Sequence, residues 1–210
     1  MAIKPILFNT KMVRANLDGR KACTRRLVNP RQFMGMLPDR CKNATPDEFL
    51  KNKRMMFKPY CDMTDAELIM TVYKEPYQPG DILYVRETWH KGLERYIYRA
   101  DYSDTEKFYR DGKEIEMKWR PSIHMPKEAA RIWLKVTDVR AERLQEMWAS
   151  DVPKEGIYFT KPTTAGEMLM DFAKLWNSTI KKSDIDRYGW DANPWVWIIE
   201  FERCEKSECI

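Results

Sequence analysis

Residues 19–26, with the sequence GRKACTRR, bring together the groups that acyl-transfer chemistry needs. The segment holds four cations, the Cys23 thiol and the Thr24 hydroxyl within eight residues. Neighbouring cations disfavour the charged form of a lysine, and a neutral Lys21 beside an alcohol could act as its base. A helical turn or a bent loop would bring Lys21 and Thr24 to one side, whereas a flat strand would separate them. The segment is a candidate catalytic centre, and a solvated basic turn is the alternative.

Three other segments combine residue types that bind or transform polar substrates. They contain Arg86, Glu87, Trp89, Arg120, Ser122, His124 and Glu155. The first group ends an expected strand. The second belongs to a segment whose two prolines, Pro121 and Pro126, restrict the backbone. The last residue precedes a turn-forming glycine. The alternatives are an ion pair at a sheet rim, a structural histidine and an ordinary exposed carboxylate.

Several enzyme classes are excluded by the absence of their motifs from the sequence. It contains no Walker loop, GxGxxG turn, HExxH helix or GxSxG elbow. Two histidines, His90 and His124, argue against a zinc site built on several histidines. We therefore expect neither a metal nor a cofactor.

The elements that must position these residues follow from hydrophobic periodicity and turn signals. The expected strands are Lys4–Phe8, Ile82–Glu87 with Tyr96–Ala100 as its hairpin partner, Ala130–Arg140 and Pro194–Arg203. The expected helices are one capped by Thr10 and ended by Gly19, one starting at Thr45–Glu48, Leu144–Trp148 and Thr164–Trp176. Several strands, few helices and long connections predict an α+β fold, a small closed β-barrel with peripheral helices.

The chain length fits one domain with an elaborate insertion. Its 210 residues include 43% hydrophobic residues, enough for a sizeable core. Between about residues 30 and 77 prolines are frequent and apolar residues few, so we interpret this stretch as an inserted flap on a single domain of residues 1–210.

Charge and targeting signals restrict partners and location. The net charge of +5 modestly favours a nucleotide or nucleic-acid partner over a membrane. The first residues lack the pattern of a signal peptide, and no run of about 18 apolar residues occurs. We expect a cytoplasmic protein that does not bind membranes.

Several separated segments resemble the ASCH domain family, a branch of the PUA-like β-barrels, in the longer form common in phages and prophages. They are ILFNTKMVRANLDGRKACTRR, PGDILYVRETW, KWRPSIHMP, VTDVRAERLQEMW with KEG, and YGWDANPWVWIIEFER. Residues 30–75 carry no part of the resemblance. The resemblance implies a PUA-like barrel fold. It also implies a protein located in the cytoplasm of a bacterial or phage-infected cell.

The resemblance also implies an activity. A small bacterial member of this superfamily is an amidohydrolase that removes the acetyl group from N4-acetylcytidine. Its Gly-Arg-Lys-x-x-Thr segment matches Gly19, Arg20, Lys21 and Thr24 here. This implies Lys21 as proton acceptor, Thr24 as nucleophile and Glu155 as proton donor.

The chain also departs from that small enzyme. It is about twice as long, and the added VRETW and WRPSIHMP segments are expected to reshape the pocket. The implied substrate-binding residues are Arg20, Arg25, Arg26, Arg86, Glu87, Trp89, Arg120, Ser122 and His124. Cys23 is a further nucleophile, which we expect to be inert unless the cations stabilise its thiolate.

The predicted function is hydrolysis of an N4-acylated cytidine-type nucleoside, nucleotide or RNA base. One alternative is a non-catalytic RNA-binding module in which the basic segment and Trp89, Trp119 or Trp190 hold phosphates and bases. Another is metal-dependent RNA cleavage, with Glu87, Asp101 and Glu155 as candidate ligands.

Overall fold

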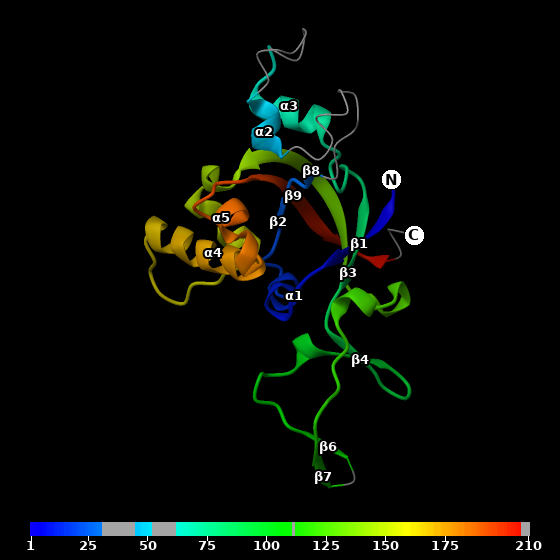
Figure 1. Ribbon diagram of the computed structural model, residues 1–210. Coiled ribbons are helices and arrows are strands. Elements are labelled where there is room, and N and C mark those ends of the chain that lie inside the picture. Colours follow the sequence, from blue (N-terminus) through cyan, green and yellow to red (C-terminus); the bar gives the residue numbers. More distant parts are fainter. Residues whose placement is uncertain (31–44, 52–61, 111, 207–210) are drawn as a thin grey trace.

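The protein has a mixed α+β fold built on one five-stranded sheet. The computed structural model describes residues 1–30, 45–51, 62–110 and 112–206. The strands run in the order β1-β3-β8-β9-β2. Their bounds are β1 Ile3–Leu7, β2 Cys23–Leu27, β3 Ile82–Arg86, β8 Trp133–Arg143 and β9 Trp195–Cys204. β8 and β9 form long curved arcs at the centre of the molecule (Figure 1).

β9 carries core residues on both of its faces. As its alternation predicts, Trp195, Trp197, Ile199 and Phe201 share one face and join the main hydrophobic core. The intervening residues Val196 and Ile198 pack on the other face, in a second cluster with residues of helix α4. The strand is therefore covered on both sides, which explains why its sequence is almost continuously apolar.

The sheet is open, so the closed barrel expected from the sequence is not what the described residues form. β1 pairs in parallel with β3, and β2 pairs antiparallel with β9, which leaves β1 and β2 as the two edges. β1 stops at Leu7 because Asn9 caps the following helix and turns the chain away. A side chain spans the two edges instead, since the Arg26 guanidinium donates to the Leu7 carbonyl oxygen at 2.9 Å.

Helices α1 (Thr10–Leu17), α4 (Ala165–Thr179) and α5 (Ile185–Tyr188) lie beside the sheet (Figure 1). The cap of α1 is Asn9 rather than the expected Thr10, because the Asn9 side chain accepts the Met12 N–H at 2.9 Å. α4 begins after Thr164, as predicted, in a capping box with Glu167.

The helix expected at Leu144–Trp148 was wrong. Only the 3-10 turn η7 (Leu144–Glu146) forms there. The Leu144 N–H donates to the Pro194 carbonyl oxygen at 3.0 Å, which extends the pairing of β8 with β9 to the first residue of the expected helix.

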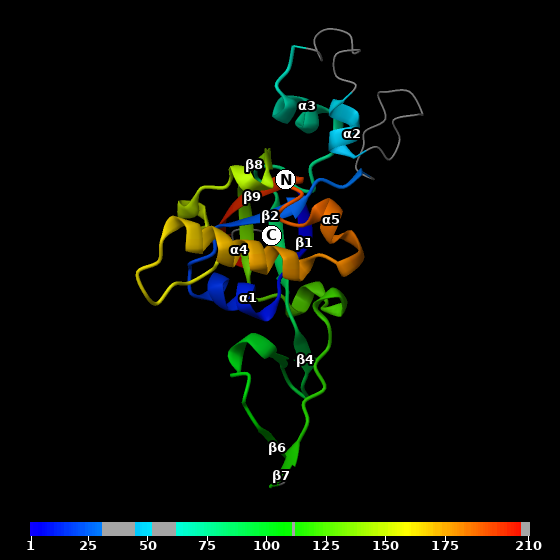
Figure 2. The same cartoon turned by 60° about the vertical axis from the view of Figure 1, so that its left-hand side comes forward.

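The hairpin partner predicted for the Ile82–Glu87 strand was also wrong. β3 already has β1 on one side and β8 on the other, so neither of its edges is free. β5 (Tyr96–Tyr98) pairs instead with β4 (Trp89–Lys91), and β6 (Phe108–Arg110) pairs with β7 (Lys113–Ile115). These two hairpins extend away from the sheet, below α1 in Figure 2.

Helices α2 (Pro46–Leu50) and α3 (Asp65–Val72) belong to the stretch that we interpreted as an insertion. Thr45 caps α2 in a capping box with Glu48, and Pro46 lies in the first turn, which confirms the predicted helix start. Phe49 and Leu68 are buried in the main core cluster together with β1 and β9 residues. Residues 31–44 and 52–61 of the expected insertion lie outside the described residues.

Candidate functional site

Lys21 is positioned by the turn that ends α1. Gly19 adopts a φ of +72°, a left-handed conformation that glycine takes without strain and that reverses the chain. The N–H groups of Arg20 and Lys21 then both donate to the Ala15 carbonyl oxygen, at 2.9 and 3.1 Å. Lys21 therefore lies in a bent segment before β2, as its proposed chemistry requires, and not on a flat strand.

Glu155 is brought to Lys21 by a second turn. It ends the 3-10 helix η9 (Pro153–Glu155), and Gly156 follows with a φ of +93°. The Ala22 N–H donates to the Lys154 carbonyl oxygen at 2.9 Å, which ties this turn to the start of β2. Two backbone turns thus place residues 134 positions apart in contact.

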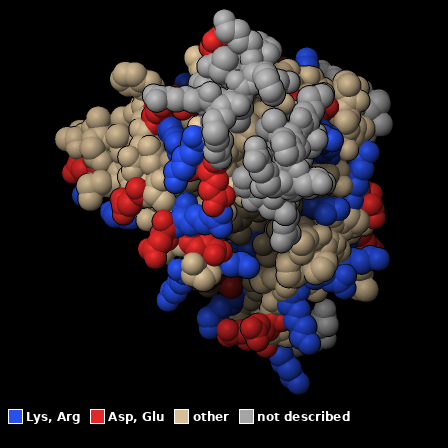
Figure 3. All heavy atoms as spheres, turned by 45° about the horizontal axis from the view of Figure 1, so that its top comes forward, with Lys and Arg blue, Asp and Glu red and all other residues tan. Residues whose placement is uncertain are grey.

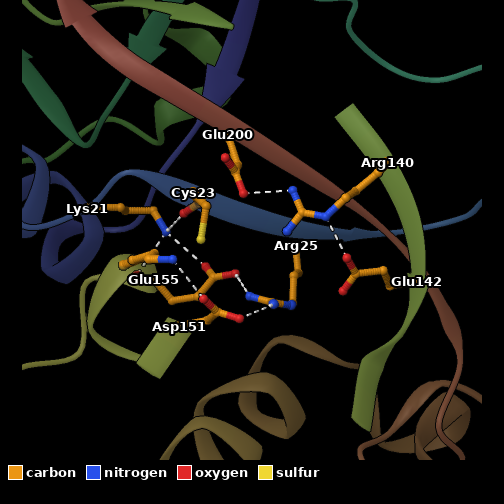
Figure 4. Close-up of polar contacts among 9 residues, drawn as sticks. Lys21, Cys23, Arg25, Arg140, Glu142, Asp151, Glu155 and Glu200 are labelled. Atoms are coloured by element: carbon orange, nitrogen blue, oxygen red, sulfur yellow. Dashed lines mark hydrogen bonds and ion pairs between the residues drawn. The ribbon is translucent and has the colours of Figure 1, made fainter. Parts of the chain in front are cut away.

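The Lys21 ammonium is buried and uses three acceptors (Figure 4). It donates to the carbonyl oxygens of Cys23 at 2.7 Å and Glu155 at 2.8 Å, and to the Glu155 carboxylate at 3.1 Å. An ammonium has three N–H bonds, so this geometry satisfies all of them. The Lys21 and Glu155 side chains are 1% and 6% exposed, so their contact is buried.

Arg25 lies on the opposite side of the same carboxylate. Its guanidinium donates to Glu155 Oε1 at 2.9 Å and lies 3.8 Å from Asp151 Oδ2. The side chain is only 2% exposed. Glu155 therefore accepts from two buried cations, and Arg25 fixes its carboxylate toward Lys21 (Figure 4).

Thr24 is a buried residue of β2, where it lies opposite Ile199 of β9. Within the described part of the chain, its hydroxyl has no hydrogen-bond partner. It is therefore available to a ligand.

One cavity joins these groups. It has a volume of about 90 Å³ and lies between β2, the end of β1, the start of α1 and one face of α4. Its lining residues are Leu7, Phe8, Asn9, Met12, Lys21, Thr24, Arg25, Arg26, Glu155, Phe172, Leu175, Trp176 and Thr179. Both edge strands of the sheet contribute, so the cavity occupies the place where a barrel would have closed.

Comparisons with known proteins identified no relative. No protein-family model matches the chain, and neither the curated proteins nor the solved structures gave a match. The resemblance to ASCH domains thus rests on the sequence segments quoted above.

Cys23 does not line the cavity. Burial, together with the charge of Glu155, raises the pKa of its thiol to about 12, although Arg25 and Lys21 oppose the shift. The thiol therefore stays protonated at neutral pH, in agreement with the expectation that it is inert.

Arg20 and Arg26 have different surroundings although both flank the catalytic candidates. Arg20 forms an ion pair with Asp18 at 2.7 Å and lies over the Tyr158 ring, outside the cavity lining. Arg26 lines the cavity and is exposed to solvent.

The VRETW and WRPSIHMP segments meet one another but do not reach the cavity. Trp89 and Arg120 exchange backbone hydrogen bonds at 3.2 and 2.7 Å, and the Arg120 guanidinium lies over the indole. Arg86 donates to the Ile123 carbonyl oxygen at 3.2 Å, in a turn that also holds the predicted residues Ser122 and His124. The described cavity lining includes none of the six residues predicted from these two segments.

Glu87 has a structural partner that the sequence did not reveal. Arg131 donates to both of its carboxylate oxygens, at 2.8 and 3.0 Å, and also binds Asp101. Burial raises the pKa of Glu87, while the hydrogen bonds from Arg131 oppose that shift. This arrangement favours the ion-pair alternative for Glu87 over a role in substrate binding.

Carboxylates elsewhere are also held by cations. Asp138, Glu142 and Glu200 surround the Arg140 guanidinium. Among the described residues, no group of three or more His, Cys, Asp or Glu side chains is arranged to hold a metal ion.

In the described ranges, no helix has the length and apolar character needed to cross a membrane.

Sequence reasoning missed the wall that α4 contributes to the cavity. Phe172, Leu175, Trp176 and Thr179 have the i, i+3, i+4, i+7 spacing of one helix face. That periodicity is visible in the sequence. It identifies the side of α4 that faces the interior, but it does not indicate that this side lines a cavity.

Proposed function

We propose that this protein is a hydrolase that cleaves the N-acyl amide of a modified cytidine-type base, with Thr24 as nucleophile. The observation that carries the proposal is the shared cavity, because Lys21, Thr24 and Glu155 all line it. Amide hydrolysis needs a nucleophile, a base beside it and an acid for the departing nitrogen. These three residues can supply all three groups.

The hydrogen bond between Lys21 and Glu155 suggests how one ion pair provides both a base and an acid. Transfer of a proton along this 3.1 Å contact converts the ammonium and carboxylate into an amine and a carboxylic acid. Because the pair lines the cavity, a bound substrate that replaces water there favours the neutral pair over two charges. Arg25 opposes the transfer, because it stabilises the Glu155 carboxylate, and so restrains it until substrate is bound.

Lys21, Thr24 and Glu155 account for every proton that moves in the acylation step. The Lys21 amine takes the Thr24 hydroxyl proton while Thr24 Oγ1 bonds to the acyl carbon. As the carbon–nitrogen bond breaks, the Glu155 carboxylic acid protonates the leaving exocyclic nitrogen. This restores the ammonium and carboxylate of the resting pair.

Release of the acyl group uses the same pair. After a second proton transfer from Lys21 to Glu155, the Lys21 amine takes a proton from water, and the resulting hydroxide attacks the Thr24 ester. The ester oxygen then receives a proton from Lys21 and the carboxylic acid product leaves, after which Glu155 returns its proton to Lys21. We assign oxyanion binding to Arg25, because its side chain lines the cavity.

The size of the cavity indicates which part of the substrate enters it. At about 90 Å³ it is smaller than the roughly 150 Å³ cavity that accommodates benzene in an engineered protein. A whole nucleoside does not fit inside this volume. The acyl group and the amide nitrogen therefore enter, while the sugar remains at the mouth.

The ASCH-like fold remains part of this proposal. Its support is the sequence resemblance together with a strongly curved antiparallel core, in which β9 pairs with both β8 and β2. The Arg26 contact with Leu7 brings the two sheet edges together at one corner, as in a barrel closed by side chains rather than by a ladder.

The face shown in Figure 3 gives less support to a dedicated RNA-binding module. Cationic and anionic side chains are interspersed there, without a continuous basic stripe. Non-specific nucleic-acid binding depends on such a stripe, because phosphate contacts supply most of its free energy.

The test is incubation of the protein with N4-acylated cytidines, their nucleotides and acylated RNA, with release of the acyl group followed by mass spectrometry. We expect turnover by the wild type and none by Lys21→Ala or Lys21→Met, with Lys174→Ala as a control on the exposed side of α4. Thermal unfolding identifies a variant that fails to fold. Acyl release by folded Lys21→Met at the wild-type rate would rule out the mechanism.

Two further outcomes identify the alternative functions. RNA cleavage that stops with a chelator would indicate a metal-dependent ribonuclease. RNA binding that falls steeply with salt, without turnover of any substrate, would indicate a binding module.

A further inference from the structure

We propose that the Arg26 guanidinium binds a phosphate group of the substrate, which makes the substrate a nucleotide, free or within RNA, rather than a neutral nucleoside. The inference takes the identity of the base from the proposed function. It concerns a different part of the substrate, namely the part that remains outside the cavity.

The four cations of residues 20–26 differ in their charge pairing. Arg20 is paired with Asp18, and both Lys21 and Arg25 are paired with Glu155. Arg26 differs from these three cations, since within the described ranges no carboxylate lies within ion-pair distance of it. Its charge is therefore available to an anion that the protein itself does not provide.

The position of Arg26 places its side chain near any part of the substrate that stays outside the cavity. Arg26 lines the cavity and is exposed, so it lies at the mouth, where one side of the side chain faces the ligand and the other faces water. The cavity is too small for a nucleoside, as shown above. A sugar phosphate that projects from the mouth would therefore meet this residue.

The Arg26 side chain is preorganised by its contacts within the protein. The Arg26 side chain is held by its hydrogen bond to the Leu7 carbonyl oxygen at 2.9 Å, and its guanidinium lies 5.9 Å from the centre of the Phe8 ring. A guanidinium has five N–H donors in a planar fork that matches two oxygens of a phosphate. The described contacts leave donors free for such a bidentate interaction.

The charge of the cavity lining agrees with an anionic ligand. Lys21, Arg25 and Arg26 contribute three positive charges and Glu155 one negative charge, so the formal balance is +2. A neutral nucleoside would leave this excess uncompensated, whereas a phosphate monoester would compensate most of it and the single charge of an RNA phosphodiester would halve it.

The inference can be tested by binding alone, without turnover. Isothermal titration of the wild type with cytidine, cytidine 5′-monophosphate, cytidine 3′-monophosphate and a short cytidine-containing oligonucleotide measures the contribution of the phosphate and its source. We expect at least one phosphorylated ligand to bind about tenfold tighter than cytidine, and Arg26→Gln to abolish that difference. Arg203→Gln, an exposed arginine of β9 outside the cavity, is the charge-matched control and should retain it.

The outcomes separate this inference from the proposed function. Equal affinity of the wild type for cytidine and for all phosphorylated ligands would overturn the role of Arg26, even if acyl release is observed. A phosphate preference that persists in Arg26→Gln would overturn it too. A preference that depends on Arg26 supports the inference even if no acylated substrate is hydrolysed, in which case only the hydrolase proposal fails.

Discussion

Glu155 holds the Lys21 ammonium with two different groups, its main-chain carbonyl oxygen at 2.8 Å and its side-chain carboxylate at 3.1 Å. The carbonyl fixes where the ammonium lies, and the carboxylate determines whether a proton can be exchanged. Position and reactivity are therefore separable by mutation, because a substitution of the side chain leaves the carbonyl in place.

Glu155→Gln removes the proton exchange and leaves two buried cations without their shared anion. We expect a loss of activity of about 10²-fold or more and a decrease of roughly 3 kcal/mol in the free energy of unfolding. Acyl release and urea unfolding measure the two effects. Glu202→Gln, at an exposed position of β9, should change neither, and a fully active Glu155→Gln enzyme would contradict the assigned role.

Thr24→Val replaces the hydroxyl by a methyl group of similar shape. Valine is well suited to a strand, and the Thr24 hydroxyl has no hydrogen-bond partner among the described residues, so we expect the free energy of unfolding to change by no more than about 1 kcal/mol while acyl release is lost. Thr24→Ser should keep measurable activity. If Thr24→Val turns over like the wild type, water rather than Thr24 attacks the acyl group.

Gly156→Ala tests the turn that brings Glu155 to Lys21. The glycine has a φ of +93°, and an added Cβ would lie 2.7 Å from the Ala15 Cβ, so the turn must move. We expect a destabilisation of about 1–3 kcal/mol and reduced activity. Gly166→Ala is the matched control, because no atom lies near its added Cβ within α4 and the helix should tolerate or favour alanine. Unchanged stability of Gly156→Ala would show that the turn is not constrained as described.

Asp81 gives the fold a predictable dependence on pH. Burial alone would raise the pKa of this carboxyl, but hydrogen bonds from Lys4 and from the N–H groups of Ala2 and Gln78 outweigh burial and hold it below its ordinary value of 3.8. A carboxyl whose pKa is depressed in the folded state stabilises the fold at higher pH. That stabilisation is lost as the pH falls through the folded-state pKa, below about 3.8.

Asp81→Asn should therefore destabilise the protein by about 1 kcal/mol at pH 7 and by clearly less at pH 3. Urea unfolding at the two pH values measures the difference. Asp191→Asn, at an exposed position, serves as the control. An effect of Asp81→Asn that is equal at both pH values would contradict the assignment.

Local sequence patterns predicted the elements whose residues interact with near neighbours. The alternation of β9, the cap of α4 at Thr164 and the start of α2 at Thr45 all depend on contacts within a few residues. The openness of the sheet and the partner of β5 depend on which strand edges remain free. That information is distributed over the whole chain, so local patterns predicted a closed barrel and the wrong hairpin.

The site was predicted only in part for the same reason. Residues 19–26 indicated Lys21 and Thr24 by their types, but the contact between Lys21 and Glu155 spans 134 positions and came from the resemblance to a family. Arg86 and His124 have equally suggestive types and lie outside the cavity lining. The type of a residue shows which chemistry its side chain can perform, whereas only the fold determines which side chains come into contact.

Two of the three acceptors around the Lys21 ammonium belong to the main chain, at Cys23 and Glu155. Their presence is determined by the path of the polypeptide and does not depend on which side chains occupy those two positions. A divergent protein could thus keep the same two main-chain acceptors for the lysine ammonium with neither a cysteine nor a glutamate at those positions. A search by residue identity would overlook such a protein. Such proteins would be recognised by the pair of left-handed glycine turns on either side of the lysine.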